Sequence, residues 1–273
     1  MKKANSSGKS SFQSDLESLL TENIVSIISK CHQVQAGHIG GSLSLSLFLL
    51  PLLYSLKMSN SLNDVELVLS KGHASLGLYS ILHTLKINSD PYHRYCTLES
   101  DSFHGHTCKH ADNLIVHSTG SLGHGLPFAY GRALGNRVLG VSADKTILCI
   151  IGDGEMQEGT FYECYLHLSQ HSQLNLKVII DDNNSIETQT SSCTEIIKRI
   201  SRDNFSTIDC SGFRQCISII DIFKLPGLQF IHCKTSKYVG LPSAFHDPKW
   251  HAGIPTDNEL HQMITGLLPI FTK

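Results

Sequence analysis

The sequence predicts an α/β fold in which a mostly parallel sheet carries helices on both faces. Short apolar runs rich in β-branched residues, each stopped by polar residues or glycine, indicate buried strands. They alternate with longer helical segments, which is typical of parallel sheets because their neighbouring strands are joined by crossover helices. Ligands of such sheets bind beyond the carboxyl ends of the strands, so we expect a site in the loops that follow the strands.

The N-terminal part of the chain predicts a tail and two helices. Residues 1–12 are polar and basic, without the apolar run of a signal peptide, and are expected to form a flexible tail. A helix is expected at residues 14–35. The most apolar stretch, residues 43–56 (LSLSLFLLPLLYSL), contains three serines and Pro51 and is shorter than the roughly 20 residues of a membrane span. It predicts a buried core helix, and no membrane partner is expected.

The rest of the chain predicts alternating strands and helices. Each strand is short and β-branched, as in TILCIIGD and LKVIIDD. The strands are expected at residues 67–70, 146–153, 176–182, 205–210 and 229–235. The further helices are expected at residues 74–86, 124–141, 157–172, 191–200, 213–223 and 257–267. No internal repeat or low-complexity linker interrupts this order, so a single domain over residues 13–273 is expected.

Composition narrows the class of protein. The chain has 273 residues, of which 41% are hydrophobic and 17% charged, with a net charge of −2. This leaves no basic surface for nucleic acid, so no nucleic-acid partner is expected. The nine cysteines form no C-x-x-C pair and are odd in number, which predicts reduced thiols in a cytoplasmic protein. The sixteen histidines, many of them beside glycine, require a chemical explanation.

The second predicted strand ends in a carboxylate between two glycines, Gly152-Asp153-Gly154, followed by Glu155. The glycines let the backbone turn sharply while the carboxylate points into the crevice. A dinucleotide fingerprint is excluded because Gln157 stands where G-x-G-x-x-G needs glycine, and the chain contains no P-loop motif. A purely structural turn would look the same, so this loop alone does not establish a site.

A second polar residue follows the next strand. Asn183 lies thirty residues after Asp153, and a strand, helix and strand of that length would bring the two side chains to neighbouring strand ends. A carboxylate, an amide oxygen and a backbone carbonyl make a sparse oxygen site with room for phosphate oxygens and water, which suits Mg²⁺ with a diphosphate. A helix starting near Gln157 would offer its N–H groups to the same anion. The pair predicts a Mg²⁺-diphosphate cofactor.

Here the sequence resembles the transketolase family. GDG followed 28 residues later by NN is the thiamine diphosphate signature, and the string GDGEMQEGTFYECYLHLSQHSQLNLKVIIDDNN looks like the family's diphosphate-binding domain. Four further motifs agree in order and spacing: GHIGGS at 37–42, LSKGH at 69–73, Gly105-His106 ahead of STGSLGHG at 118–125, and KT at 234–235 with PKWH at 248–251. The resemblance covers about residues 15–255 and implies the thiamine diphosphate-binding fold.

The resemblance implies the ligands of the cofactor. Asp153 and Asn183, with the carbonyl of Ser185, would bind Mg²⁺, for which Ca²⁺ or Mn²⁺ could substitute. Thiamine diphosphate itself would be bound by residues of the same motifs. These are His73, Gly120, Ser121, Leu122, Gly154, Glu155, Asn183 and His251.

The resemblance also implies catalytic and interface residues. His38, His106 and His251 would be catalytic, holding ketose hydroxyls and moving protons, for which imidazole is well suited near neutral pH. Glu158 and Glu163 would lie at the subunit interface and link two cofactors, although a solvated helix face would carry the same charges.

An alternative metal site overlaps one of these histidines. His104, His106, Cys108 and His110 stand at alternating positions, so in an extended segment they would face one side and suit zinc. A loop rich in glycine and threonine explains the same residues without a metal.

Several positions depart from the family pattern. Proline is absent after His38 and after His106, and His124 stands where glutamine is usual. Tyr238-Val239-Gly240 replaces the usual G-K-G, and the stretch after Asn183 lacks the family's loop ending in DG. The cofactor ligands are kept while the loops over the substrate are altered, so neither the donor nor the acceptor sugar is implied.

The length of the chain after the last motif bears on its partners. Only 22 residues follow His251, too few for the pyrimidine-binding domain of full-length transketolases. The resemblance therefore implies the N-terminal subunit of a split transketolase, paired with a C-terminal pyrimidine-domain subunit in an α2β2 assembly. It would move a two-carbon ketol unit from a ketose to an aldose, with sugars or sugar phosphates as substrates.

Two alternatives to this function stay open. One is half of another thiamine diphosphate enzyme, such as a specialised acyl or ketol transferase or a 2-oxo acid dehydrogenase α-type subunit. The other is a catalytically silent partner subunit, which the altered loops allow. The LSKGH and WH motifs favour transketolase over the first alternative, and the retained histidines and cofactor ligands argue against the second.

Overall fold

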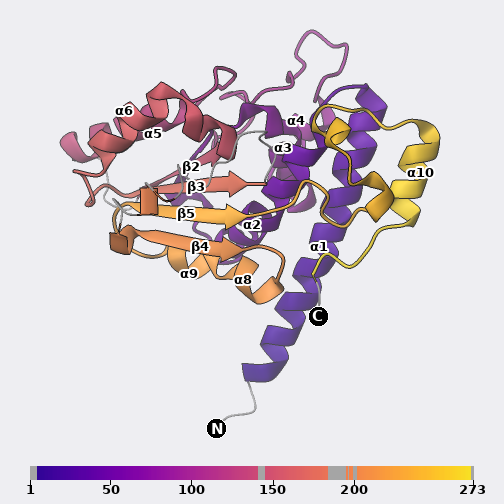
Figure 1. The fold of residues 1–273 in the computed structure, drawn as a ribbon, viewed down its shortest axis with the longest axis horizontal. Helices are drawn as coiled ribbons and strands as arrows, with labels where there is room; N and C mark the ends of the chain where they lie inside the picture. The colour runs from indigo at the N-terminus through magenta and orange to yellow at the C-terminus, as the bar shows by residue number, and fades with distance from the viewer. Residues whose placement is uncertain (1–4, 141–144, 184–194, 196, 199–201, 272–273) are drawn as a thin grey trace.

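A computed structural model describes residues 5–140, 145–183, 195, 197–198 and 202–271 (Figure 1). Its centre is a five-stranded sheet of order β1-β2-β3-β5-β4, in which every neighbouring pair is parallel. The strands are β1 (Val65–Leu69), β2 (Thr146–Gly152), β3 (Leu176–Asp182), β4 (Phe205–Asp209) and β5 (Gln229–Lys234). The predicted parallel sheet is confirmed, with every strand end within two residues of expectation.

Helices cover both faces of the sheet, as predicted. α5 (Gly125–Val138) and α6 (Gly159–Leu168) lie on one face, and Figure 1 shows α8 (Phe213–Ile217) and α9 (Ile219–Phe223) on the other. The face of α8 and α9 is also covered by α2. The remaining bounds are α1 (Asn5–Val34), α2 (Ile39–Met58), α3 (Ser75–Thr84), α4 (Asp90–His93) and α10 (Asp257–Thr265).

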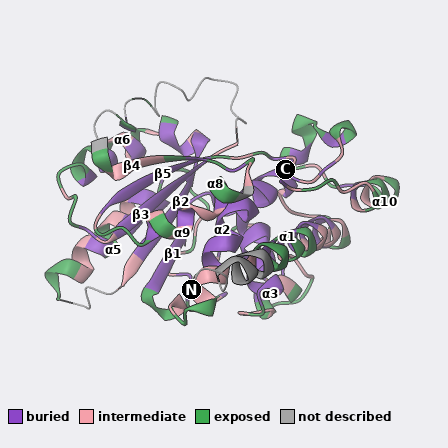
Figure 2. Ribbon diagram, turned by 90° about the horizontal axis from the view of Figure 1, so that it is seen from below, coloured by how far each residue is buried: buried purple, intermediate pink, exposed green. Residues whose placement is uncertain are grey.

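The core forms two layers because successive strand residues point to opposite faces. In β2, Leu148 and Ile150 belong to the layer that includes α1, α2 and α3, whereas Ile147, Cys149 and Ile151 belong to the layer under α5 and α6. Both sets are buried, as expected for a parallel sheet covered on both sides. Figure 2 shows these buried strands and α2 in the interior, with exposed residues on α1 and α10.

Several helices depart from the expected bounds. α1 begins at Asn5, so residues 5–12 are helical where a flexible tail was expected. α2 begins at Ile39 and continues through Pro51 for 20 residues. The helix expected at residues 213–223 is two short helices that meet at Ser218. The helix expected at residues 191–200 lies largely outside the described residues.

α2 is confirmed as a buried core helix. By length and composition it could cross a membrane, yet 89% of its apolar window is buried inside the protein. Its serines are satisfied within the core: Ser46 donates to the Ser42 carbonyl at 2.9 Å, and Ser44 donates to Asp181 Oδ2 at 2.8 Å. The polar residues of this helix therefore connect it to its neighbours, and Ser44 reaches the sheet.

α2 and α3 touch backbone to backbone at Gly77. A Cβ added there would lie 2.8 Å from Ser42 Cα and 2.9 Å from the Ser42 carbonyl oxygen. The Gly77 amide donates to Ser42 Oγ at 3.0 Å, so α2 satisfies one of the first-turn N–H groups of α3. This contact holds the segment that enters α3, which carries His73, against the start of α2.

We expect Gly77→Ala to lower the free energy of unfolding by about 1 to 3 kcal/mol, because the added methyl meets helix backbone that cannot step aside. Gly131→Ala is the matched control, since Gly131 is exposed in α5 and an added Cβ there meets nothing within 4 Å. Its alanine should raise stability by about 0.5 to 1 kcal/mol through helix propensity. Urea unfolding measures both variants, and equal stabilities would contradict the close contact.

Candidate active site

The predicted cation ligands lie at neighbouring strand ends. Asp153 directly follows β2 and Asn183 directly follows β3, and these strands are paired up to Gly152 and Asp181. Asp153 is buried, and its Oδ1 accepts the Gly154 amide at 3.0 Å. Asn183 Oδ1 is buried and has no hydrogen-bond partner among the described residues. The third predicted ligand, Ser185, lies outside the described residues.

These two side chains fit a hard divalent cation. A buried amide oxygen without a partner costs free energy unless a ligand meets it. Carboxylate and amide oxygens are the donors that Mg²⁺ accepts, and a site with few protein ligands leaves positions for phosphate oxygens. The geometry at this edge therefore agrees with a cation held together with an anion.

Three of the predicted histidines form a cluster beside this edge. His38 directly precedes α2, His73 follows β1, and His251 lies in a short turn at residues 248–251. Their ring centroids are 5.3 Å apart for His38 and His73, 5.6 Å for His38 and His251, and 5.5 Å for His73 and His251. His106 is exposed beside them, close enough for its charge to act on the pKa values of His38 and His73.

The environment keeps the clustered histidines neutral. Burial is the main cause, and it lowers the pKa of His73 to about 2, with Lys71 and the neighbouring rings adding to the effect. The pKa of His38 is lowered by burial and then by His251, and the pKa of His251 by burial and then by Lys237. Neutral imidazoles accept hydrogen bonds and protons, so the cluster can bind hydroxyls and exchange protons with them.

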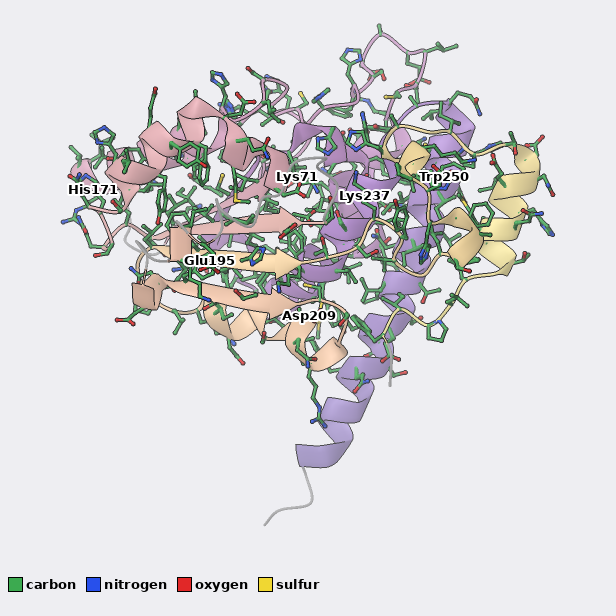
Figure 3. The ribbon with its side chains drawn as sticks, viewed as in Figure 1. Lys71, His171, Glu195, Asp209, Lys237 and Trp250 are labelled. Atoms are coloured by element: carbon green, nitrogen blue, oxygen red, sulfur yellow. The ribbon has the colours of Figure 1, made fainter. Side chains whose placement is uncertain are left out.

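Lys237 completes the cluster, although none of the sequence motifs singled it out. It is buried, its Nζ lies 3.1 Å from His251 Nδ1, and the charge of Asp153 acts on its pKa, which burial lowers. Figure 3 shows Lys237 and Trp250 beyond the strand arrowheads, with Lys71 near the tip of β3. The sequence did carry a signal for Lys237, which stands two positions after the KT motif. The mismatch of the following residues with the family's usual G-K-G pattern obscured it.

Two glycines let these groups approach the start of α2. A Cβ at Gly40 would lie 3.1 Å from Lys237 Cβ, and one at Gly41 would lie 3.0 Å from His73 Nε2. The positive end of the α2 dipole therefore lies beside a lysine and uncharged histidines. This combination favours an anion.

A buried polar network lies beneath the cation ligands. Lys71 forms an ion pair with Asp181, and both side chains are almost fully buried. Asp181 also accepts hydrogen bonds from Ser44 and Thr235, and Asn183 Nδ2 donates to Ser44 Oγ at 3.2 Å. We call Ser44, Lys71, Asp181 and Thr235 the strand-end network. It was not predicted from the sequence because each residue belongs to a different element.

Glu155 lies among the loops at the strand ends. Its buried carboxylate accepts the Gly152 amide at 2.8 Å, the Gly123 amide at 3.1 Å and the Ser70 hydroxyl, and burial raises its pKa. Its oxygens join the loops after β1 and β2 to the loop before α5, and its expected contact with the cofactor stays a prediction. The expected helix at Gln157 starts later, at Gly159.

The other predicted site residues are exposed or half-buried. Gly120, Ser121 and Leu122 lie on the surface, and Leu122 is 50% exposed. Glu158 is half-buried at the start of α6, and Glu163 is exposed on that helix.

The zinc arrangement is not supported. His104, His106 and His110 are all exposed, and Cys108 is half-buried. Within the part of the chain that the structure describes, no three His, Cys, Asp or Glu side chains are grouped to hold a metal ion. Hydrogen bonds from backbone amides order this segment instead. One of them runs from the Cys108 amide to Tyr79 Oη at 2.9 Å.

Comparisons with known proteins show what the chain as a whole resembles. Residues 21–245 match the family model of the transketolase thiamine diphosphate binding domain. Transketolase of Mycoplasma pneumoniae is 30% identical over 66% of this chain, which spans 29% of that protein. One subunit of the apulose-4-phosphate transketolase of Actinobacillus succinogenes is 26% identical, over 86% of this chain and 88% of the relative. In Phocaeicola vulgatus the subunit of the same name is 28% identical, over 91% of this chain and 92% of the relative.

Solved structures share the fold. Transketolase from Leishmania mexicana superposes with a TM-score of 0.71 at 18% identity, covering 91% of this chain and 40% of that one. The Campylobacter jejuni transketolase gives 0.68 at 22% identity, covering 95% of this chain and 43% of that one. The sheet and its helices thus correspond to part of a larger chain in both.

The low pKa of His73 predicts a pH dependence of stability. The His73 side chain takes up a proton near pH 6.5 in the unfolded chain and, with its pKa lowered to about 2, only there in the folded chain, so its contribution to stability is fully present above about pH 6.5 and is lost as the pH falls below it. Between pH 7.5 and 5 wild type should lose about 1 to 2 kcal/mol more than His73→Asn. Denaturant unfolding at both pH values measures this, with the exposed His167→Asn as the control that follows wild type. Identical pH profiles for all three would contradict the buried neutral imidazole.

Proposed function

The chain belongs to the transketolase family, and from this membership we propose that it is a subunit of a thiamine diphosphate-dependent ketol transferase that uses Mg²⁺. It would move a two-carbon ketol unit from a ketose to an aldose. When bound, thiamine diphosphate supplies the electron sink for breaking a carbon–carbon bond beside a carbonyl. One observation carries the proposal. At the same edge of the sheet, the unpartnered amide oxygen of Asn183 lies next to the Asp153 carboxylate and close to the cluster of neutral histidines.

The cofactor's charged end would lie over the ends of β2 and β3. Asp153 and Asn183 would hold Mg²⁺, with the carbonyl of Ser185 as the expected third ligand. Lys237 and His73 would face the diphosphate, since one is a buried cation and the other a neutral donor beside the start of α2. Gly120, Ser121 and Leu122 would lie against the aminopyrimidine, and their exposure supports contact with a ligand.

The histidines would bind the hydroxyls of the sugar, each as a donor or an acceptor according to its own hydrogen bonds. Lys237 donates to His251 Nδ1, so the neutral imidazole carries its proton on Nε2 and presents an N–H donor. His38 Nδ1 is buried and has no partner among the described residues, which suits a substrate hydroxyl. His106, exposed at the rim, would complete the set.

A second subunit would cover the exposed part of the site. The two relatives that this chain matches along 88% and 92% of their length are each named as one subunit of a transketolase, which supports a partner of another kind. We propose an α2β2 assembly in which the partner is a C-terminal, pyrimidine-domain subunit, with Glu158 and Glu163 at the interface. Because both relatives are named for a sugar phosphate, phosphorylated sugars are the first substrates to assay.

Asp153→Asn is expected to weaken Mg²⁺-dependent binding of thiamine diphosphate by roughly 100-fold or more while the fold is kept, since a lost outer-shell partner alone costs 10- to 100-fold. Calorimetric titration of the complex with its partner subunit measures this. Asp209→Asn is the control, because Asp209 is an exposed carboxylate at the end of β4, apart from the lysines of the site (Figure 3). Unchanged affinity in Asp153→Asn would remove this residue as a ligand.

The chain by itself is expected to show no ketose-dependent turnover and weak cofactor binding, because Gly120, Ser121 and Leu122, which would lie against the aminopyrimidine, are open to solvent. Adding the C-terminal subunit should restore turnover. Cofactor and partner should also strengthen each other's binding by the same factor, as linkage requires. Robust turnover of this chain in the absence of any other protein would overturn the split-subunit proposal.

A further inference from the structure

We propose that Ser44 is a positioning residue that orients the Asn183 amide with its oxygen toward the cation. The inference rests on the proposed function, since it concerns a ligand of the proposed Mg²⁺ site. Ser44 lies on α2 and is completely buried in the strand-end network. It touches neither substrate nor cation in this arrangement, and it acts through Asn183.

The hydroxyl of Ser44 has four polar neighbours. Its Oγ lies 2.8 Å from Asp181 Oδ2 and 3.1 Å from the Gly41 carbonyl oxygen, both of which only accept hydrogen bonds. It also lies 3.4 Å from Lys71 Nζ and 3.2 Å from Asn183 Nδ2, both of which only donate. A hydroxyl has one hydrogen to donate and two lone pairs to accept with.

This inventory determines how the hydrogen bonds run. The single Ser44 hydrogen goes to a pure acceptor, Asp181 or Gly41, so its lone pairs remain for the ammonium of Lys71 and for Asn183. A lone pair can be met only by the NH₂ side of the Asn183 amide. The reversed amide would place its carbonyl oxygen against an oxygen with no hydrogen left to donate.

The rest of the network prevents the alternative arrangement. Asp181 Oδ1 accepts the Thr235 hydroxyl, and Asp181 Oδ2 accepts Lys71, so the carboxylate is held from two sides. Lys71 further donates to the Gly41 carbonyl at 3.3 Å. Whether the Ser44 hydroxyl donates to Asp181 or to the Gly41 carbonyl, its hydrogen points away from Asn183, and either orientation selects the NH₂ side of the Asn183 amide.

The consequence appears at the other end of the amide. Asn183 Oδ1 is buried and lacks a hydrogen-bond partner among the described residues, as expected for an oxygen whose partner is a bound cation. If the amide were reversed, its NH₂ group would point at the cation and the interaction would be repulsive. Removing Ser44 Oγ should therefore cost affinity for the metal by leaving the amide free to reverse.

The test is metal binding rather than turnover. We expect Ser44→Ala to weaken binding of Mn²⁺ with thiamine diphosphate by roughly tenfold, within the 10- to 100-fold range of a lost outer-shell partner. The probe is Mn²⁺, titrated with thiamine diphosphate into the complex of this chain with its partner subunit, and the loss of the free-ion electron paramagnetic resonance signal reports binding. Thermal unfolding of the same samples establishes that the variants are folded.

Ser46→Ala is the matched control. Ser46 lies in the same helix, is equally buried, and makes two comparable hydrogen bonds, donating to the Ser42 carbonyl at 2.9 Å and accepting from Asn23 Nδ2 at 2.7 Å. Ser46 does not reach the strand-end network, so the Ser46→Ala variant should be less stable than wild type and should bind Mn²⁺ with unchanged affinity. Should Ser44→Ala fail to fold, Ser44→Cys keeps a side-chain group whose sulfur is a weak acceptor, and it should weaken binding as well.

A double-mutant cycle separates orientation from general damage. In an Asn183→Asp background one carboxylate oxygen faces the cation and the other faces Ser44 Oγ whichever way the group turns, so orientation no longer matters and Ser44→Ala should cause no further loss of Mn²⁺ affinity. An equal loss in both backgrounds would overturn the orientation role, as would equal Mn²⁺ affinity of Ser44→Ala and wild type. Absence of Mn²⁺ binding by the wild-type complex would overturn the proposed function, and this inference with it.

Discussion

The buried ion pair of Lys71 and Asp181 is the constraint around which the site is arranged. Two charges withdrawn from water are tolerated only when their remaining hydrogen-bonding groups are satisfied. Here Ser44, Thr235 and the Gly41 carbonyl satisfy them, and these groups come from the start of α2 and the end of β5. Satisfying one pair of charges thus holds four separate segments together at the carboxyl edge of the sheet.

The same charges set the chemistry of the histidines above them. Lys71 lowers the pKa of His73 and His251, and Lys237 lowers the pKa of His38 and His251, in each case after the larger effect of burial. Two buried lysines beside the start of a helix favour the binding of an anion. The negative charge of that anion would raise the pKa of the histidines, against the effect of the lysines. The residues that attract a diphosphate therefore also govern the protonation of the groups that meet the sugar.

Sequence reasoning succeeded where the signal was local and failed where it depended on how loops pack. The strand ends were predicted within two residues because alternation and polar stops are written along the chain. The hydrogen bond from the Gly123 amide to the Glu155 carboxylate was not predicted, because it depends on how the loop before α5 packs against the loop after β2. Ser44 looked like one of three serines in an apolar helix, and nothing along that helix indicates that it reaches Asp181. The start of α1 was missed because polar residues 5–12 carry no apolar pattern.

By itself the sequence determined the parallel α/β fold, the family, and which residues follow the strands, because these depend on order and spacing. Motif spacing was enough to place Asp153 and Asn183 at neighbouring strand ends. Only the tertiary structure decided which polar atoms face a ligand and which are used within the protein. The physical reason is that a buried hydroxyl, amide or carboxylate has a small number of hydrogen bonds to make, and its partners come from segments far apart in the chain.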